Sequence, residues 1–137
     1  MIRLEHANLS VENTEAMKQF LLTAFPGFRI RGGGTDGQGR QWCHVGDDEF
    51  YIALQSVPNN NRRAPYDNST GLNHLGWEVD DLEALEDRMT GAGFPSNMKA
   101  DDHPARNRHY FYDPDGNDWE FVQYSSDEAQ ERNDYST

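Results

Sequence analysis

The chain has 137 residues, with 12 lysines and arginines against 24 aspartates and glutamates, and a formal net charge of −12. This balance argues against a nucleic-acid partner, because phosphates are bound by clustered basic side chains. A single cysteine rules out an internal disulfide and a thiolate zinc cluster. No apolar run is long enough to cross a membrane, and the N-terminus shows no signal segment, so we expect a soluble, cytoplasmic protein.

The first 57 residues show the patterns of one strand, one helix and three further strands. Polarity alternates in each strand segment, whereas the apolar residues between Asn13 and Pro26 recur at helical spacing. Asn13 or Thr14 is expected to cap the helix, and Pro26-Gly27 to end it. A mobile turn is expected at Gly32–Gly34 and Asp36-Gly37. The four strands are predicted at residues 2–11, 28–31, 40–46 and 49–57.

The same order returns in the second half of the chain. Residues 58–70 are polar, contain proline and lack periodicity, which predicts a linker loop. A strand at 72–79, a helix with the apolar stripe of Leu82, Leu85 and Met89, and a weak strand at 97–100 then follow. Two strands within 108–124 are joined by the turn sequence Asp113-Pro114-Asp115-Gly116. Residues 126–137 are polar and acidic and are expected to fray.

These patterns predict two copies of one βαβββ unit, at residues 1–57 and 71–125, that together form one domain of the α+β class. Superposing the first strands of the two units pairs His6 with His74. Superposing their last strands pairs Ala53 with Glu120, at the same spacing to within one residue. Because the strands were assigned independently, this agreement supports an internal repeat.

Glu120 is the residue on which the functional hypothesis depends. It lies in mid-strand beside bulky aromatic residues, where a carboxylate is costly unless another group pairs with it. If each unit curls its strands around one side, His6 and His74 approach Glu120 from different strands. Two imidazoles and one carboxylate would form a metal site with open positions for substrate. Two alternatives stay open: each histidine can be a structural strand residue, and Glu120 can join a core network or pair with Arg108 across the hairpin.

Several other side chains are candidates for the same site. His103 is a candidate acid or base, and Tyr110 and Tyr112 share a face from which they could donate to a bound oxyanion. Cys43 and His44, on a predicted strand, are interpreted as packing residues. The candidate pocket residues, which lie in phase with the predicted ligands, are Asn8, Tyr51, Gln55 and Tyr112.

Three segments carry a family resemblance: LEHANLSV, GLNHLGWEV and YFYDPDGNDWEF. They resemble the vicinal oxygen chelate superfamily, which includes glyoxalase I, bleomycin-resistance proteins, fosfomycin-resistance enzymes and extradiol dioxygenases. The resemblance extends from Leu4 to Tyr124. It implies paired βαβββ repeats that form a cupped mixed sheet with a helix outside each repeat, and a divalent metal held by His6, His74 and Glu120. It also implies a homodimer, in which some members of the superfamily build each cup from halves of two chains.

The subgroups of this superfamily differ at positions that the sequence shows. Glyoxalase I has a fourth ligand, a glutamate, where this chain has Ala53. Fosfomycin-resistance enzymes share the three ligands and Tyr110, but their phosphonate-binding residues have no evident match. Extradiol dioxygenases have a signature near the end of the domain whose spacing this chain matches. The matching residues are His103, Tyr110, Pro114, Gly116 and Glu120.

The resemblance to extradiol dioxygenases favours Fe(II) as the metal, with Mn(II), Zn(II), Ni(II) and Co(II) as the other candidates. Two positions depart from the dioxygenase pattern, because His109 replaces an apolar residue and the loop at 58–70 contains no histidine. The leading hypothesis is an extradiol-dioxygenase-like enzyme that binds its substrate through two adjacent oxygens. The alternatives are a glyoxalase-like lyase or isomerase acting on a thiol conjugate or a 2-oxo compound, and a non-catalytic small-molecule-binding protein of the resistance type.

Overall fold

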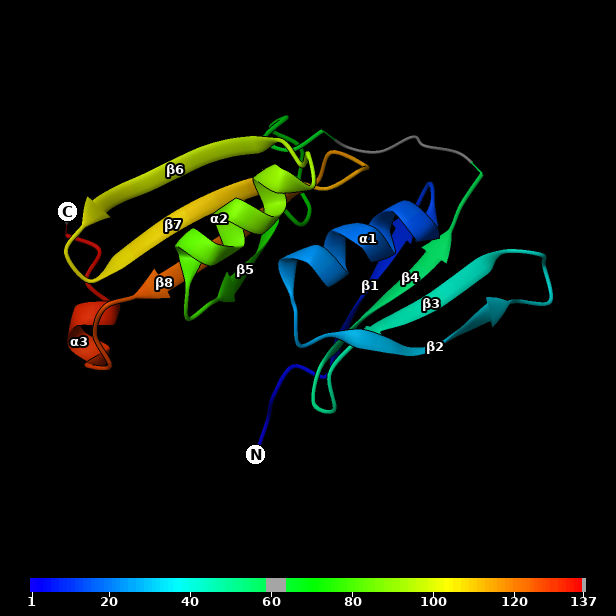
Figure 1. The fold of residues 1–137 in the computed structure, drawn as a ribbon, viewed down its shortest axis with the longest axis horizontal. Helices are drawn as coiled ribbons and strands as arrows, with labels where there is room; N and C mark the ends of the chain where they lie inside the picture. Colours follow the sequence, from blue (N-terminus) through cyan, green and yellow to red (C-terminus); the bar gives the residue numbers. More distant parts are fainter. Residues whose placement is uncertain (59–63, 137) are drawn as a thin grey trace. The chain divides into compact units, whose positions relative to one another are not determined.

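The computed structural model describes residues 1–58 and 64–136 of the chain. They form two compact units, one within residues 1–58 and one within residues 64–136 (Figure 1). Each unit contains a strand, a helix and three strands in that order. The predicted α+β fold of two βαβββ repeats is therefore confirmed. Part of the predicted linker, residues 59–63, lies outside the described residues.

The first unit is a four-stranded mixed sheet covered by one helix. The strands lie in the order β1-β4-β3-β2, and only β1 and β4 are parallel. Helix α1 (Thr14–Ala24) begins at Asn13, whose side chain accepts a hydrogen bond from the Ala16 N–H. It buries Met17, Phe20, Leu21 and Ala24 and packs against β3 and β4. The strands are β1 (His6–Val11), β2 (Arg29–Thr35), β3 (Gln41–Gly46) and β4 (Tyr51–Ser56).

The glycines Gly32–Gly34 lie inside strand β2, so the part of the predicted turn that covers them was wrong. They pair with the segment of β3 around Trp42. A Cβ atom on Gly33 would lie 3.1 Å from the Trp42 carbonyl oxygen, and one on Gly34 would lie 3.4 Å from the Trp42 indole nitrogen. The glycines therefore make room for Trp42. The turn begins at Asp36, within the predicted Asp36-Gly37 part, and the Asp36 carboxylate accepts from the backbone N–H groups of Gln38 and Arg40.

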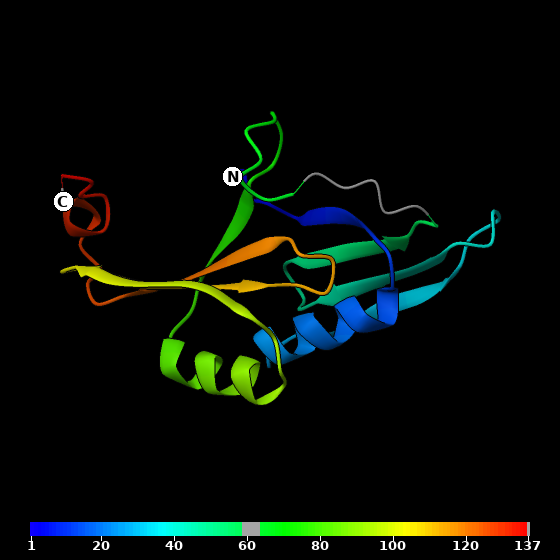
Figure 2. The same cartoon turned by 90° about the horizontal axis from the view of Figure 1, so that it is seen from above.

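The second unit repeats this architecture, with strand order β5-β8-β7-β6 and only β5 and β8 parallel. Helix α2 (Leu82–Gly91) lies along one face of the sheet (Figure 2). Its N-cap is Asp81, whose carboxylate accepts from the Ala84 N–H. Leu85 and Met89 are buried with Phe111, Trp119 and Phe121 in the core of this unit. The strands are β5 (His74–Glu78), β6 (Ser96–His103), β7 (Arg106–Tyr112) and β8 (Asp118–Tyr124).

The turn between β7 and β8 is built around the buried carboxylate of Asp113. This carboxylate accepts hydrogen bonds from the backbone N–H groups of Asp115 and Asn117, from the Asn117 amide and from the Trp119 indole. Burial raises the Asp113 pKa, and the donors from Trp119 and Asn117 oppose that shift. Gly116 has φ of 78°, as the turn prediction required. The start of β8, and with it Glu120, is thus fixed by a hydrogen-bonded turn.

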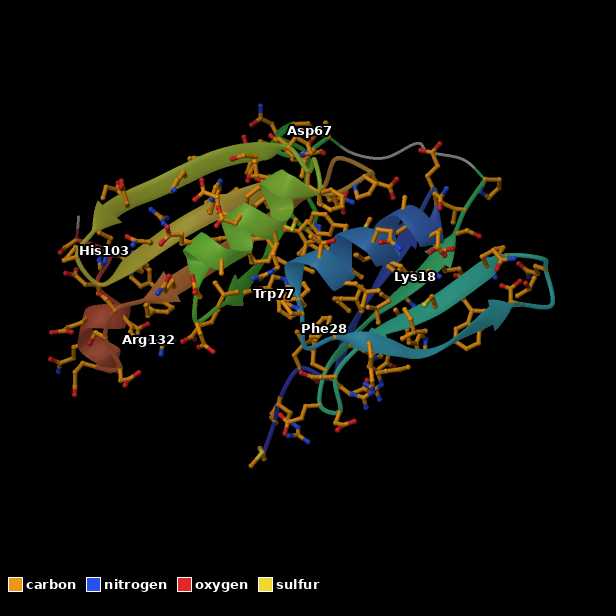
Figure 3. All side chains as sticks on the ribbon, viewed as in Figure 1. Lys18, Phe28, Asp67, Trp77, His103 and Arg132 are labelled. Atoms are coloured by element: carbon orange, nitrogen blue, oxygen red, sulfur yellow. The ribbon has the colours of Figure 1, made fainter. Side chains whose placement is uncertain are left out.

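The C-terminal segment, where a frayed tail was predicted, contains helical structure among its described residues. It forms the short helix α3 (Ala129–Arg132) next to the end of the second sheet, where His103 and Arg132 are labelled in Figure 3. Arg106 donates to the carbonyl oxygens of Arg132 and Asp134, at 2.9 and 3.2 Å. None of the helices in the part of the chain that the structure describes has the length and apolar character needed to span a bilayer.

Candidate metal centre

Three adjacent strands of the second unit bring polar side chains to the face of the sheet opposite helix α2. In the sheet register, Glu120 on β8 lies between Gly76 on β5 and Tyr110 on β7. His74 lies two residues before Gly76, so alternation places it on the same face. The core residues Trp119 and Phe121 flank Glu120 and point to the opposite face. The carboxylate therefore stands on the open face of the sheet.

Glu120 has two partners in this unit. The Tyr110 hydroxyl donates to its Oε1 atom at 2.6 Å, and its Oε2 atom lies 3.0 Å from the Nε2 atom of His74. Arg108, which was considered as a cross-strand partner, lies opposite Val122 instead. The half-buried Glu120 carboxylate is thus in contact with an aromatic hydroxyl and an imidazole.

The orientation of His74 makes this contact informative. Its Nδ1 atom lies 2.6 Å from the side-chain oxygen of Asn73, a geometry in which Nδ1–H donates to the amide. In the neutral imidazole, Nε2 then carries a lone pair that faces the Glu120 carboxylate, which is also an acceptor. In this tautomer the two acceptors, 3.0 Å apart, need a positive centre between them, whereas in the other tautomer Nε2–H donates to the carboxylate. Either a proton or a metal ion meets that requirement, so the donor set fits a divalent metal.

Tyr110 and Gly76 shape the surroundings of the carboxylate. Tyr110 is 5% exposed, and burial, followed by its hydrogen bond to Glu120, raises the pKa of its hydroxyl above the usual value. Tyr110 therefore remains a hydrogen-bond donor at neutral pH. A Cβ atom on Gly76 would lie 3.3 Å from Glu120 Oε2, so the glycine leaves space beside this oxygen.

The first unit holds the repeat-equivalent histidine in a similar way. His6 bonds through Nδ1 to the carboxylate of the preceding residue, Glu5, and its ring stacks on Tyr51 with the centroids 4.9 Å apart. As in His74, this bond occupies Nδ1 and leaves Nε2 for another partner. Asn8 and Gln55 lie in register on the same face as His6.

Ala53, the position where glyoxalase I has its fourth metal ligand, also lies on this face of the first unit. Ala53 pairs with Asn8 on one side and with His44 on the other, and it is 4% exposed. It supplies no donor atom. His44 is half-buried and lies against Tyr51, with the ring centroids 4.7 Å apart, whereas Cys43 is buried on the helix side of the sheet.

The remaining candidate acid–base residue, His103, lies at the end of β6. Its Nε2 atom is 3.0 Å from the Asp134 carbonyl oxygen, and its Nδ1 atom accepts from the Ala105 N–H. Both nitrogens are thus engaged with backbone groups near the C-terminal segment, and its role as acid or base stays a prediction. Tyr112, two residues after Tyr110, lies opposite Asp118 in the register.

Within either unit, the described residues contain no group of three histidine, cysteine, aspartate or glutamate side chains that could hold a metal ion. The second unit supplies the pair His74 and Glu120, and His6 belongs to the first unit. A three-ligand site would need residues from both units. The convergence of His6 with the other two ligands stays a prediction.

The comparisons with known proteins bear on this arrangement. The model of the Glyoxalase/Bleomycin resistance protein/Dioxygenase superfamily matches residues 3–121. The chain belongs to this superfamily. The match covers both repeats and all three predicted ligands of this superfamily member. No curated protein sequence matches the chain.

Solved structures of the superfamily share the fold at low sequence identity. A glyoxylase/bleomycin resistance protein/dioxygenase domain from Frankia sp. EAN1pec is 18% identical, with a TM-score of 0.76 over 93% of this chain and 96% of that one. The fosfomycin resistance protein FosX from Listeria monocytogenes is 15% identical, with a TM-score of 0.74 over 96% and 98% of the two chains. A glyoxalase family protein from Enterococcus faecalis is 21% identical, with a TM-score of 0.66 over 89% and 96%.

Sequence reasoning missed the residues that orient the two histidines. Glu5 and Asn73 immediately precede His6 and His74, and each offers an acceptor to the Nδ1 atom of the next residue. Comparison of the two repeats could have found them, because an acidic or amide residue occupies the same place in both. Gly76 gave no signal in the sequence, because its importance comes from the closeness of Glu120.

Proposed function

We propose that this superfamily member is a divalent-metal-dependent enzyme that binds a small substrate through two adjacent oxygens at His6, His74 and Glu120. The main support is that His74 Nε2 lies 3.0 Å from Glu120 Oε2. The other ring nitrogen of His74 is bonded to Asn73, so Nε2 is the nitrogen available to a metal. A bound metal would supply Lewis-acid activation of the chelated oxygens. Tyr110 would hold the Glu120 carboxylate in place and donate a hydrogen bond beside the substrate.

Metal content tests this proposal. Protein purified without chelators is expected to contain about one divalent ion per chain, measured by elemental analysis, and His6→Ala, His74→Ala and Glu120→Ala are each expected to lose it. His44→Ala is the matched control, because His44 lies on the same face as His6 without being a predicted ligand. Equal metal content in the wild type and Glu120→Ala, or no metal in either, would remove the site.

Mixing variants shows which chain supplies His6. If the site is shared across a homodimer, co-refolded His6→Ala and Glu120→Ala chains regain one site per mixed dimer, because each chain supplies what the other lacks. If one chain supplies all three ligands, the mixture stays metal-free. Size-exclusion chromatography with light scattering measures whether a dimer forms at all.

The reaction class that we put first is oxygen-dependent cleavage of a vicinal diol, as in extradiol dioxygenases, with Fe(II) as the metal. Its support is the spacing of Tyr110, Pro114, Gly116 and Glu120, together with the contact of Tyr110 with the predicted ligand. His103 adds no support, since both its nitrogens are bonded to backbone groups. Catechol should be consumed with stoichiometric oxygen uptake by Fe(II)-loaded protein.

A second candidate is a lyase or isomerase of the glyoxalase type that does not consume oxygen. It is favoured by the similarity in fold to FosX, one structure of which is described as complexed with Mn(II) and sulfate. Mn(II), rather than Fe(II), would then be the working metal. Turnover of a substrate without any oxygen uptake would support this candidate and exclude the first.

A further inference from the structure

The open face of the second sheet continues beyond Glu120 into a cleft of about 450 Å³. Its walls come from β5, β7 and β8, and the C-terminal segment adds Arg132 and Tyr135. The residues that line it are Gly76, Trp77, Glu78, Arg106, Arg108, Glu120, Val122, Tyr124, Arg132 and Tyr135. One end of this cleft is therefore the predicted metal ligand, and the other is the C-terminal segment.

The charge of this cleft is opposite to that of the chain. The chain carries a net charge of −12, yet three of its 12 basic residues line this one cleft, against the two carboxylates Glu78 and Glu120. Glu78 is paired with Arg132, which also stacks on the Tyr124 ring at 4.0 Å. The local surplus is positive, and it lies next to the place where a divalent metal would add more positive charge.

The contacts of Arg106 and Arg132 attach the C-terminal segment to the sheet. Arg106 donates to backbone carbonyl oxygens of that segment and lies 5.0 Å from the centroid of the Tyr135 ring. These contacts explain why the last residues cover the end of the sheet. The aromatic rings of Tyr124 and Tyr135 give the cleft flat, partly apolar walls.

Arg108 is different, because little of its hydrogen-bonding capacity is used. Its described ion-pair partner, Asp102, lies 3.4 Å away and has an 80% exposed side chain. Among the described residues no group accepts from its Nε–H, although that nitrogen is buried. Arg108 and Glu120 line the same cleft, and alternation along β7 places Arg108 on the same face as Tyr110, which donates to Glu120. A buried, unpaired guanidinium N–H next to a candidate site indicates an anionic ligand.

We propose that this cleft binds an anionic oxygen group of the substrate, a carboxylate or a phosphonate, through Arg108. The substrate would thus be an organic anion that reaches the metal with its vicinal oxygens and Arg108 with its charged end. The aromatic walls suit a planar or apolar body between the two. This inference depends on the proposed function for one point, that the substrate lies beside Glu120.

Anion binding to metal-free protein tests the inference separately from metal binding. Benzoate and phenylphosphonate are the probes, and the protein is passed over a chelating resin so that no metal competes for them. The Nε–H resonance of Arg108 in ¹⁵N NMR spectra should shift saturably with one or both probes, and the tighter probe distinguishes a carboxylate from a tetrahedral anion. Absence of a saturable shift with both probes overturns the inference.

Matched variants locate the binding. Arg108→Gln is expected to weaken binding at least tenfold, whereas Arg88→Gln, the same change on helix α2 and outside the cleft, leaves it within twofold. Val122 lies opposite Arg108 in the register, so Val122→Glu supplies a competing carboxylate and should weaken binding at least tenfold, with Val122→Gln as its control. Equal affinities for Arg108→Gln and Arg88→Gln overturn the inference, as do equal affinities for the two Val122 variants.

The same preparations, reloaded with Mn(II), report on the proposed function. Metal binding without anion binding would refute the anion site and leave the metal centre intact. Anion binding without metal binding would support the anion site and refute the metal centre.

Discussion

Removing the Tyr110 hydroxyl should weaken metal binding without unfolding the protein. In Tyr110→Phe, the Oε1 atom of Glu120 loses a donor at 2.6 Å, and this donor is 5% exposed. A hydrogen bond to a charged group contributes about 1.5–3 kcal/mol. Groups that orient a metal ligand typically change affinity by about 10–100-fold, which corresponds to about 1.4–2.7 kcal/mol. The two ranges agree, so we expect the affinity for Mn(II) to fall by about one to two orders of magnitude.

Competition with a fluorescent chelator measures this affinity directly. Tyr112→Phe is the matched control, because it removes the same atom from the same face two residues along β7. Thermal unfolding of both metal-free variants shows that the fold is retained. An affinity for Mn(II) within twofold of the wild type in Tyr110→Phe would refute the assignment of Glu120 as a ligand oriented by this hydroxyl.

Three further changes test the turn, the core and the space beside the ligand. Asp113→Ala deprives four donors of their acceptor and should cost about 3 kcal/mol or more of unfolding free energy in urea titrations; a loss below about 1 kcal/mol would contradict the account of the turn. Burial lowers the pKa of His109 below 6.5, so its stabilising contribution is fully present above that pH and is lost as the pH falls; the stability of His109→Phe should therefore decline less between pH 7.5 and 5.5, and parallel curves would disprove this. Gly76→Ala places a methyl group 3.3 Å from Glu120 Oε2 and should lower the affinity for Mn(II) about tenfold, whereas Gly91→Ala, with nothing within 4 Å, should not; equal affinities would argue against a ligand role for this oxygen.

Much of the fold was predictable because the sequence contains two copies of the same pattern of strands and helix. Alternation and helical spacing are local properties, and both repeats gave the same order of elements. The faces of the strands followed as well, which is why Tyr110 and Glu120 were assigned to positions that the structure brings together. The repeat also identified His74, whose contact with Glu120 the structure shows.

The features that were missed depend on contacts between distant residues. The glycines of β2 follow a turn-like pattern, but in the structure they pack closely against Trp42 on the neighbouring strand. The C-terminal residues are polar, and they are held to the sheet by Arg106, 26 residues before Arg132, which donates to the Arg132 carbonyl oxygen. Arg108 was considered only as a partner for Glu120, since a sequence does not show that a cleft collects positive charge.

The residues in front of the two histidines also make the duplicated halves chemically inequivalent. Glu5 gives His6 an anionic acceptor, whereas Asn73 gives His74 a neutral one. A carboxylate partner polarises an imidazole more strongly than an amide does, so the two predicted ligands would not donate equally to a metal. One residue in front of each predicted ligand thus makes the two repeats differ at a position where their strands are otherwise equivalent.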